Sequence, residues 1–222
     1  MLEAASRAST CGNMQLYSLI VTQNRELREA LAPCHFNQPM VTQAPCVITV
    51  CADVHRFSMW CEQRDAEPCY DNFAWFLNGV TDALLAAQNL CVEAEAHGLG
   101  ICYLGTTIYT AEEIARILDL PKGVIPVTTI VVGHPDESPE LTDRLPLDAV
   151  VHCEKYHHYT SSEIDELWAE KETSEETRRL LEENGLPNLA QIFTRNRYRA
   201  EDNLAISRNY FALLKKQGFF NN

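Results

Sequence analysis

A long apolar helix is the feature of this sequence that most constrains the fold. From Phe73 to Ala94, apolar side chains recur at the three- and four-residue spacing that places them on one face of a helix. Gly98 follows this segment and provides a C-terminal cap. The recurring residues are Phe73, Phe76, Val80, Ala83, Leu84, Ala87, Leu90, Cys91 and Ala94. We therefore expect a long helix that is buried deep in the fold.

A strand, a short helix and a second strand precede this long helix. Residues 16–22 alternate in character and are rich in β-branched and aromatic side chains, which predicts a strand. Asn24 then caps a short helix that ends near Pro33. Residues 46–52 are almost continuously apolar, which predicts a strand that is covered on both faces and ends at Asp53.

Three more strands are expected after the long helix. Residues 98–105 predict a tight turn that leads into a short strand, and Thr110 with Glu113 has the spacing of a capping box at the start of a helix. Residues 126–133 predict another apolar strand. The chain then loosens into residues 147–152, which we interpret as a last strand.

The composition changes after residue 152. Residues 161–184 are highly charged and residues 202–217 combine apolar side chains with a following Gly218, so both segments are expected to be helical. With 222 residues, of which 46% are hydrophobic, the chain is long enough for one domain with an appendage. We interpret the charged region as that helical appendage.

The charge and the cysteine content narrow the functional classes. Eighteen Lys and Arg against 31 Asp and Glu give a formal net charge of −13, which argues against binding to nucleic acid or to anionic lipid. The apolar stretches fall far short of the roughly 20 residues that span a bilayer, and residues 1–10 lack a signal pattern. Nine cysteines with no C-x-x-C pair indicate reduced thiols. We expect a soluble, cytoplasmic protein.

The sequence carries no familiar catalytic motif, and several segments leave two interpretations open. His152, Cys153, His157 and His158 lie close together but match no zinc pattern, so no metal site is expected. The aromatic residues between positions 60 and 76 either form the wall of a flat ligand site or cover the core. Residues 9–15 either offer hydroxyl and amide groups to a ligand or form a plain loop, and Arg144 by itself fits a surface ion pair.

Several short blocks follow one another along the chain in a characteristic order. They are residues 4–15 with the ending Asn-Met-Gln, residues 36–41, residues 44–53, residues 98–105, residues 120–121, residues 132–135 and residues 144–146. In this order the blocks resemble the nitroreductase family of FMN-dependent oxidoreductases, in particular its NADPH-dependent flavin and nitro reductases. The resemblance implies an α+β fold with a mixed central sheet flanked by helices, a C-terminal helical extension and a homodimer. It implies an FMN-binding core at residues 1–155 and a helical extension at residues 156–222 that packs on the core or on the dimer partner.

The resemblance also implies the chemistry. FMN would lie at the dimer interface and contact both chains. A hydride from NADPH or NADH would pass to N5 of FMN and then, in a ping-pong sequence, to a nitroaromatic, quinone or flavin acceptor. No side chain is expected to be catalytic, because the cofactor carries the chemistry and the protein binds, orients and tunes it.

The cofactor-binding residues follow by position from the same resemblance. The loop that would lie beside the ribityl chain and the ring contains Ser9, Thr10, Cys11, Asn13 and, as a weaker member, Gln15. Gln38 would lie near the ribityl chain or the pyrimidine ring. One ring face would be lined by Tyr103, Leu104, Gly105 and Thr106, with a backbone N–H near N5. Arg144 would bind the phosphate as a bidentate donor.

Two departures from the family pattern motivate other hypotheses. The family's Arg-rich N-terminal segment would lie upstream of Met1, and residues 2–8 read as though the chain opens inside a helix. Thr142 stands where a lysine of the phosphate anchor is expected. One alternative is therefore a flavin-binding or structural dimer with little turnover. Another is that Cys11 acts as a redox-active thiol at the flavin edge.

Overall fold

The computed structural model describes residues 1–220 and divides the chain into two compact units. The sheet unit comprises residues 1–137 together with the chain from residue 206 onward, and the helical unit comprises Ser138–Ala205. The chain thus leaves the sheet unit after residue 137 and returns to it at residue 206. The sequence instead predicts one boundary, between residues 155 and 156. The assignment of FMN binding to the first part stays a prediction.

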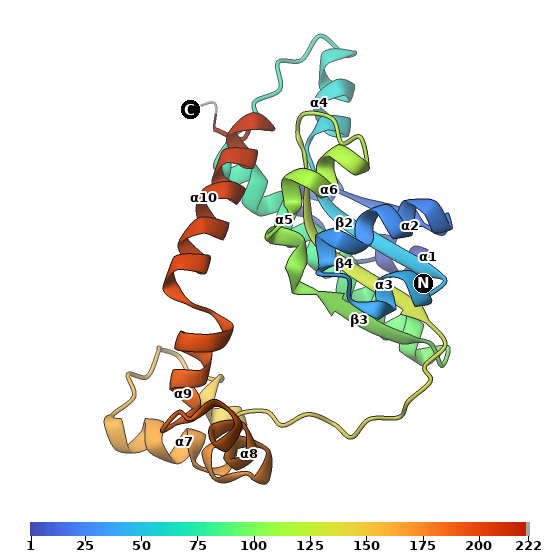
Figure 1. The fold of residues 1–222 in the computed structure, drawn as a ribbon. Helices are drawn as coiled ribbons and strands as arrows, with labels where there is room; N and C mark the ends of the chain where they lie inside the picture. Colours follow the sequence, from blue (N-terminus) through green and yellow to red (C-terminus); the bar gives the residue numbers. More distant parts are fainter. Residues whose placement is uncertain (221–222) are drawn as a thin grey trace. The chain divides into compact units, whose positions relative to one another are not determined.

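The sheet unit is built on four strands that confirm the four predicted ones in this region (Figure 1). They are β1 (Tyr17–Thr22), β2 (Cys46–Asp53), β3 (Gly100–Leu104) and β4 (Val124–Gly133), in the order β1-β2-β4-β3. Each neighbouring pair of strands is antiparallel. The sheet is therefore not the mixed sheet that was expected. Seven of the eight residues of β2 are buried, so the prediction of a strand covered on both faces is confirmed. The α+β class is confirmed as well.

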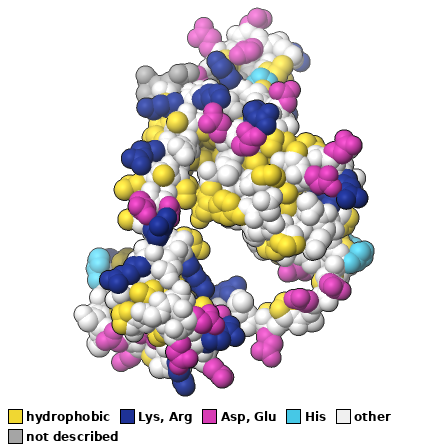
Figure 2. All heavy atoms as spheres, viewed as in Figure 1, with side chains coloured by type: hydrophobic (Ala, Val, Ile, Leu, Met, Phe, Trp, Pro, Cys, Tyr) yellow, Lys and Arg dark blue, Asp and Glu magenta, His cyan; other side chains and the backbone are white. Residues whose placement is uncertain are grey.

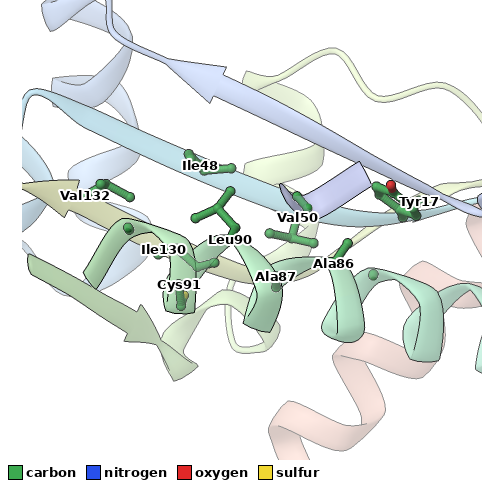
Figure 3. Close-up of a cluster of buried hydrophobic side chains, with 12 residues drawn as sticks. Tyr17, Ile48, Val50, Ala86, Ala87, Leu90, Cys91, Ile130 and Val132 are labelled. Carbon is green, nitrogen blue, oxygen red and sulfur yellow. The ribbon is translucent and has the colours of Figure 1, made fainter. Parts of the chain in front are cut away.

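The predicted long helix is α5 (Phe73–Ala96), and it packs along one face of the sheet (Figure 3). Its alanines leave room for a close approach to the strands, and alternate residues of β2 and β4 point toward it. The buried cluster includes Tyr17, Ile48, Val50, Ala83, Ala86, Ala87, Leu90, Cys91, Ala94, Ile130 and Val132. After the helix, Gly98 has a left-handed backbone at φ +72°, and the amide of Leu99 donates to the Ala94 carbonyl at 3.0 Å. The predicted glycine stop is confirmed.

Within residues 1–220, only one side of α5 is buried. Apolar side chains on its other side stay exposed, with exposed fractions of 48% at Leu77, 44% at Leu84 and Leu85, and 57% at Val92. The prediction that Leu84 faces the core is therefore wrong. Hydrophobic side chains also gather elsewhere on the visible surface of the sheet unit (Figure 2). A helix that is apolar on both sides is typical of a helix covered by a second surface.

The opposite face of the sheet carries most of the short helices of the sheet unit. Those on this face are α2 (Arg25–Leu31), η2 (Ala32–His35), α3 (Pro39–Gln43), η3 (Gly105–Ile108) and α6 (Ala111–Ile117). Val47 and Val131 point to this face, where they pack with Ala32, Val41 and Leu104. On the other side, α1 (Leu2–Ser6) packs against α5, and η1 (Cys11–Asn13) and α4 (His55–Glu62) are the remaining short helices of the sheet unit.

The caps of these helices show where local sequence rules hold and where tertiary contacts override them. The predicted cap at Asn24 is confirmed, because its side chain accepts a hydrogen bond from the Leu27 amide at 2.8 Å. The predicted capping box at Thr110 is wrong. Its hydroxyl donates to the Cys34 carbonyl at 2.7 Å instead of capping α6, and Glu113 pairs with Arg116.

The helical unit confirms the predicted helices of the charged region. It contains η4 (Leu147–Ala149), α7 (Ser161–Thr173), α8 (Glu175–Asn184), α9 (Leu189–Ile192), the π-helix η5 (Phe193–Arg197) and the start of α10 (Ala200–Lys216). The strand interpretation of residues 147–152 is wrong, because this segment forms a 3₁₀ turn and has no strand partner among residues 1–220. Thr160 and Glu163 form a capping box at the start of α7.

The end of α10 and the following Phe219 belong to the core of the sheet unit. Leu213, Leu214 and Phe219 are buried and pack with Phe76, and the Tyr210 hydroxyl donates to the Pro126 carbonyl at 3.0 Å. Within residues 1–220, no helix combines the length and the apolar composition needed to cross a membrane. All nine cysteines are free thiols.

Candidate functional site

The first group of predicted site residues is the loop between α1 and β1. Ser9, Asn13 and Gln15 are exposed, and Thr10 and Cys11 are half-buried. The loop contains the turn η1 and is tightly bent, with left-handed backbone at Gly12 (φ +55°), Asn13 (φ +56°) and Gln15 (φ +50°). The Gln15 side chain donates to Asn13 Oδ1 at 2.9 Å. The structure thus presents several hydroxyl and amide groups together on one surface.

A buried carboxylate holds this loop in place. Asp82 of α5 is 1% exposed, and its two oxygens accept hydrogen bonds from the Cys11 amide at 2.8 Å and from the Leu16 amide at 3.0 Å. These bonds pin both ends of the loop to the long helix. Sequence reasoning missed Asp82. The available signal was a lone acidic residue on the otherwise apolar inner side of the helix, next to Ala83.

An arginine at the start of α4 supports the same loop. The Arg56 guanidinium donates to the carbonyls of Gln15 and Tyr17, the latter at 3.1 Å. It also pairs with Asp53 at 3.5 Å, and the Ser18 hydroxyl donates to that carboxylate. Arg56 was not among the predicted site residues. Its position directly after a buried strand that ends in Asp53 was the signal that could have found it.

The second group lies where β3 ends and η3 begins, next to the turn that precedes α3. Nδ1 of His35 lies 2.8 Å from the Thr106 hydroxyl, and the Gln38 amide donates to the His35 carbonyl at 3.1 Å. The structure therefore brings the predicted residues Gln38 and Thr106 close to one another. A Cβ atom added to Gly105 would meet no atom within 4 Å, so the backbone there fronts open space.

The side chains of two residues in this group, Leu104 and Tyr103, contact other parts of the protein. The Leu104 side chain is 2% exposed and packs with Val41 and Val47, so only its backbone is available to a ligand. The Tyr103 hydroxyl donates to Gln88 Oε1 of α5 at 3.4 Å. Burial, together with a hydrogen bond to Cys91, raises the pKa of Tyr103, so the phenol is neutral at physiological pH.

The two groups lie at opposite edges of the sheet. The loop at residues 9–15 leads into β1, the second group follows β3, and these are the two edge strands. Three steps between neighbouring strands separate them, which amounts to roughly 14 Å at the usual strand spacing. Within one chain the predicted site residues therefore form two separate groups rather than one closed pocket.

Arg144 belongs to the helical unit. Its guanidinium donates to Thr142 Oγ1 at 2.6 Å and to the Asp143 carbonyl at 2.8 Å. In the described part of the chain it has no carboxylate within ion-pair distance, because the neighbouring Asp143 pairs with Lys171 at 2.8 Å. That lysine lowers the pKa of Asp143. A cavity of about 650 Å³ is lined by Arg144, Lys171 and Arg197 together with the carboxylates of Glu140, Asp143, Glu166, Glu170 and Glu176.

The aromatic segment and the histidine segment both make local contacts. The rings of Phe57, Tyr70 and Trp75 pack edge-on against one another at 5.2 and 4.7 Å and cover the core of the sheet unit. His157 pairs with Glu163 at 2.9 Å. Within residues 1–220, no three His, Cys, Asp or Glu side chains gather as a metal site would require.

The comparisons with known proteins identify the family. The model of the nitroreductase family matches residues 1–134, and this chain belongs to that family. It is 33% identical over 159 residues to an FMN reductase (NADPH) of Bacillus subtilis and 35% identical over 161 residues to an NADPH-dependent oxidoreductase of Staphylococcus aureus. Each match covers 71% of this chain and 64% of the relative, so the chain spans less than two thirds of these curated relatives. The family prediction is confirmed.

Solved structures show the same fold. A Bacteroides fragilis protein described as an oxidoreductase is 50% identical with a TM-score of 0.97, and the match covers 99% of this chain and 89% of that one. NfrA2 of B. megaterium is 30% identical with a TM-score of 0.81, and 100% and 87% of the two chains are covered. The NfrA1 nitroreductase of B. subtilis is 27% identical with a TM-score of 0.86, and 100% and 89% are covered.

Proposed function

We propose that this chain is an FMN-dependent oxidoreductase that takes a hydride from NADPH or NADH and passes it to a nitroaromatic, quinone or flavin acceptor in a ping-pong sequence. The observation that carries the proposal is the pair of half-sites at opposite edges of the sheet, one rich in hydroxyl and amide groups and one with a glycine that fronts open space. Membership of the nitroreductase family and the names of its relatives support the same reading.

The residues present fit FMN. The cofactor has a polar ring edge and a ribityl chain, and the side chains of Ser9, Thr10, Asn13 and Gln38 each offer donors or acceptors to such groups. The missing side chain at Gly105 leaves space for a planar ring to approach the backbone. We assign the phosphate to Arg144, whose guanidinium forms no ion pair with a carboxylate within the described residues.

A second copy of the chain would complete the site. The exposed apolar side of α5, with Leu77, Leu84, Leu85 and Val92, gives a homodimer an apolar surface to cover. A loop from one copy would then meet the β3 end of the other, and each of two equivalent sites would hold one cofactor. The homodimer and its shared sites are part of the proposal.

The chain's residues bind and orient in this scheme. FMN, when bound, supplies the hydride chemistry. Asp82 keeps the loop at residues 9–15 in a fixed conformation, and Arg56 supports the end of that loop. The backbone at residues 103–105 forms one wall of the ring site. Such preformed groups need little reorganisation during the reaction.

An anaerobic reduction experiment tests the proposal. The full chain is loaded with FMN, freed of excess cofactor and mixed with NADPH or NADH without oxygen. We expect the visible flavin band to bleach, and to return when a quinone or a nitroaromatic compound is added without more nicotinamide. A chain that binds FMN but does not bleach would instead support the alternative of a flavin-binding dimer with little turnover. A chain that binds no FMN would refute the proposal.

An arginine variant tests the phosphate assignment. Arg144→Met removes a charged hydrogen-bond donor, which is worth roughly 1.5–3 kcal/mol, so we expect the Kd for FMN to rise about 10- to 100-fold. The Kd for riboflavin, which lacks the phosphate, should stay the same. Arg25→Met is the matched control, because Arg25 is an exposed arginine paired with Glu29 on α2. Equal weakening of both flavins would contradict the assignment.

A further inference from the structure

We propose that His35 is a positioning residue of the flavin site, because its imidazole fixes the Thr106 hydroxyl as a hydrogen-bond donor toward the cofactor and its carbonyl holds the Gln38 backbone. The inference rests on the proposed function, since Thr106 and Gln38 are cofactor contacts only if the chain binds FMN. His35 joins the segment of Gln38 to the segment of Thr106.

His35 connects η2 to η3 and to the turn before α3 through its hydrogen bonds. It ends η2, is fully buried, and reaches η3 through the 2.8 Å contact between its Nδ1 and the Thr106 hydroxyl. Its carbonyl accepts from the Gln38 amide at 3.1 Å. Beside it, the Thr110 hydroxyl of the α6 start bonds to the Cys34 carbonyl at 2.7 Å, which ties η2 to the same region.

The environment of the imidazole selects its tautomer. Nε2 is buried and has no hydrogen-bond partner among residues 1–220. If Nε2 carried the proton, an N–H donor would be orphaned in the interior, which is rarer in proteins than an orphaned acceptor. The proton therefore belongs on Nδ1, which donates to the Thr106 oxygen. The hydroxyl hydrogen of Thr106 is then directed away from His35 and is free to donate to a ligand.

Simple core packing does not account for this histidine. A leucine would fill the position without leaving a buried polar atom unpaired, and the unpaired Nε2 disfavours the folded state. Burial also lowers the pKa of His35 to about 4, so the ring stays neutral at physiological pH. A polar side chain that persists in such a place is typical of a functional constraint.

The turn after His35 is strained, which supports the same conclusion. Phe36 and Asn37 have left-handed backbones at φ +55° and φ +54°, a conformation that is an outlier for a bulky residue such as phenylalanine. The turn is held by hydrogen bonds from the Phe36 amide to the Pro33 carbonyl and from the Asn37 amide to the Ala32 carbonyl, at 3.2 and 2.9 Å. Strain of this kind persists only where the surrounding structure fixes the chain, and it clusters at functional sites.

Variants of the two partners test the proposal. His35→Leu removes the donor, and His35→Asn retains an amide N–H near the position of Nδ1. We expect His35→Leu to raise the Kd for FMN about three- to tenfold, the fold-change of one neutral hydrogen bond, without lowering the melting temperature. His35→Asn should restore the affinity. Thr106→Val should weaken binding to the same extent, and the double variant His35→Leu/Thr106→Val should show no further loss.

The controls separate the possible outcomes. His97→Leu, an exposed histidine paired with Glu93, should leave FMN binding unchanged. A wild-type chain that binds no FMN would refute the proposed function. A His35→Leu variant that binds FMN as tightly as the wild type, while Thr106→Val binds it weakly, would overturn the role of His35 alone.

An NMR measurement on the wild-type chain tests the proposal without any variant. The ring nitrogens of His35 in the labelled wild-type chain report the tautomer by their NMR chemical shifts. We expect a protonated Nδ1 and a bare Nε2 with and without FMN. Protonation at Nε2 would overturn the proposal, because Thr106 would then donate to His35 instead of to the ligand.

Discussion

The stability of the core and the conformation of the loop at residues 9–15 both depend on the Asp82 carboxylate. Asp82→Ala removes the acceptor of two backbone amides. Leu16 is fully buried, so its unpaired amide costs about 1–3 kcal/mol, whereas water can partly replace the bond at the half-buried Cys11. The sum predicts a loss of about 2–4 kcal/mol in the free energy of unfolding. Asp82→Asn keeps one carbonyl oxygen and should lose roughly half of that amount.

Urea denaturation of the purified chain, followed by circular dichroism, measures this loss. FMN titration of the same samples should show weaker binding, because the loop at residues 9–15 is no longer held at both ends. Asp136→Ala is the control, since Asp136 is exposed on the segment after β4. The reasoning fails if Asp82→Ala changes the unfolding free energy by less than about 0.5 kcal/mol, the range of an ordinary surface substitution.

Two further predictions concern acid stability and assembly. The pKa of His35 is lowered from 6.5 to about 4 in the folded chain, so below pH 6.5 the unfolded state binds more protons, and about 3 kcal/mol of stability should be lost by pH 4. His35→Leu should not show this loss. The prediction is contradicted if the free energy of unfolding, measured by denaturation at several pH values, decreases equally in the wild type and in His35→Leu. Leu84→Asp should convert a dimer into a monomer in sedimentation velocity, whereas Leu141→Asp, at a fully exposed position, should not. A dimer that persists in Leu84→Asp would show that α5 is not at the interface.

The sequence was most informative where one residue type dominates a whole element. The continuous apolar run of β2 and the helical repeat of α5 predicted two central elements of the sheet unit, because burial on both faces or on one stripe leaves a pattern that needs no partner to interpret. The order of the short blocks was enough to recognise the family. The same resemblance placed predicted cofactor contacts at Gly105 and in the loop before β1, and these stay predictions.

The errors arose where a long-range partner decides the local structure. Thr110 has the right spacing for a cap but bonds to Cys34, which is 76 residues away in the chain. Asp82 looks like a break in an apolar helix until the amides that it binds are known. Leu84 follows the helical repeat, yet it points away from the core and toward the surface that a second copy would cover. Local patterns cannot rank such competing partners.

The sharing of each flavin site between two copies can be measured with two disabled variants. Ser9→Trp blocks the loop of one half-site, and Gly105→Phe fills the open space of the other, both at exposed positions that tolerate a large side chain. Each homodimer alone should bind no FMN. After the two are mixed and allowed to exchange subunits, half of the dimers are mixed and each has one intact site, so about a quarter of the wild-type FMN capacity should return. No recovery after proven exchange would contradict a site built from two chains.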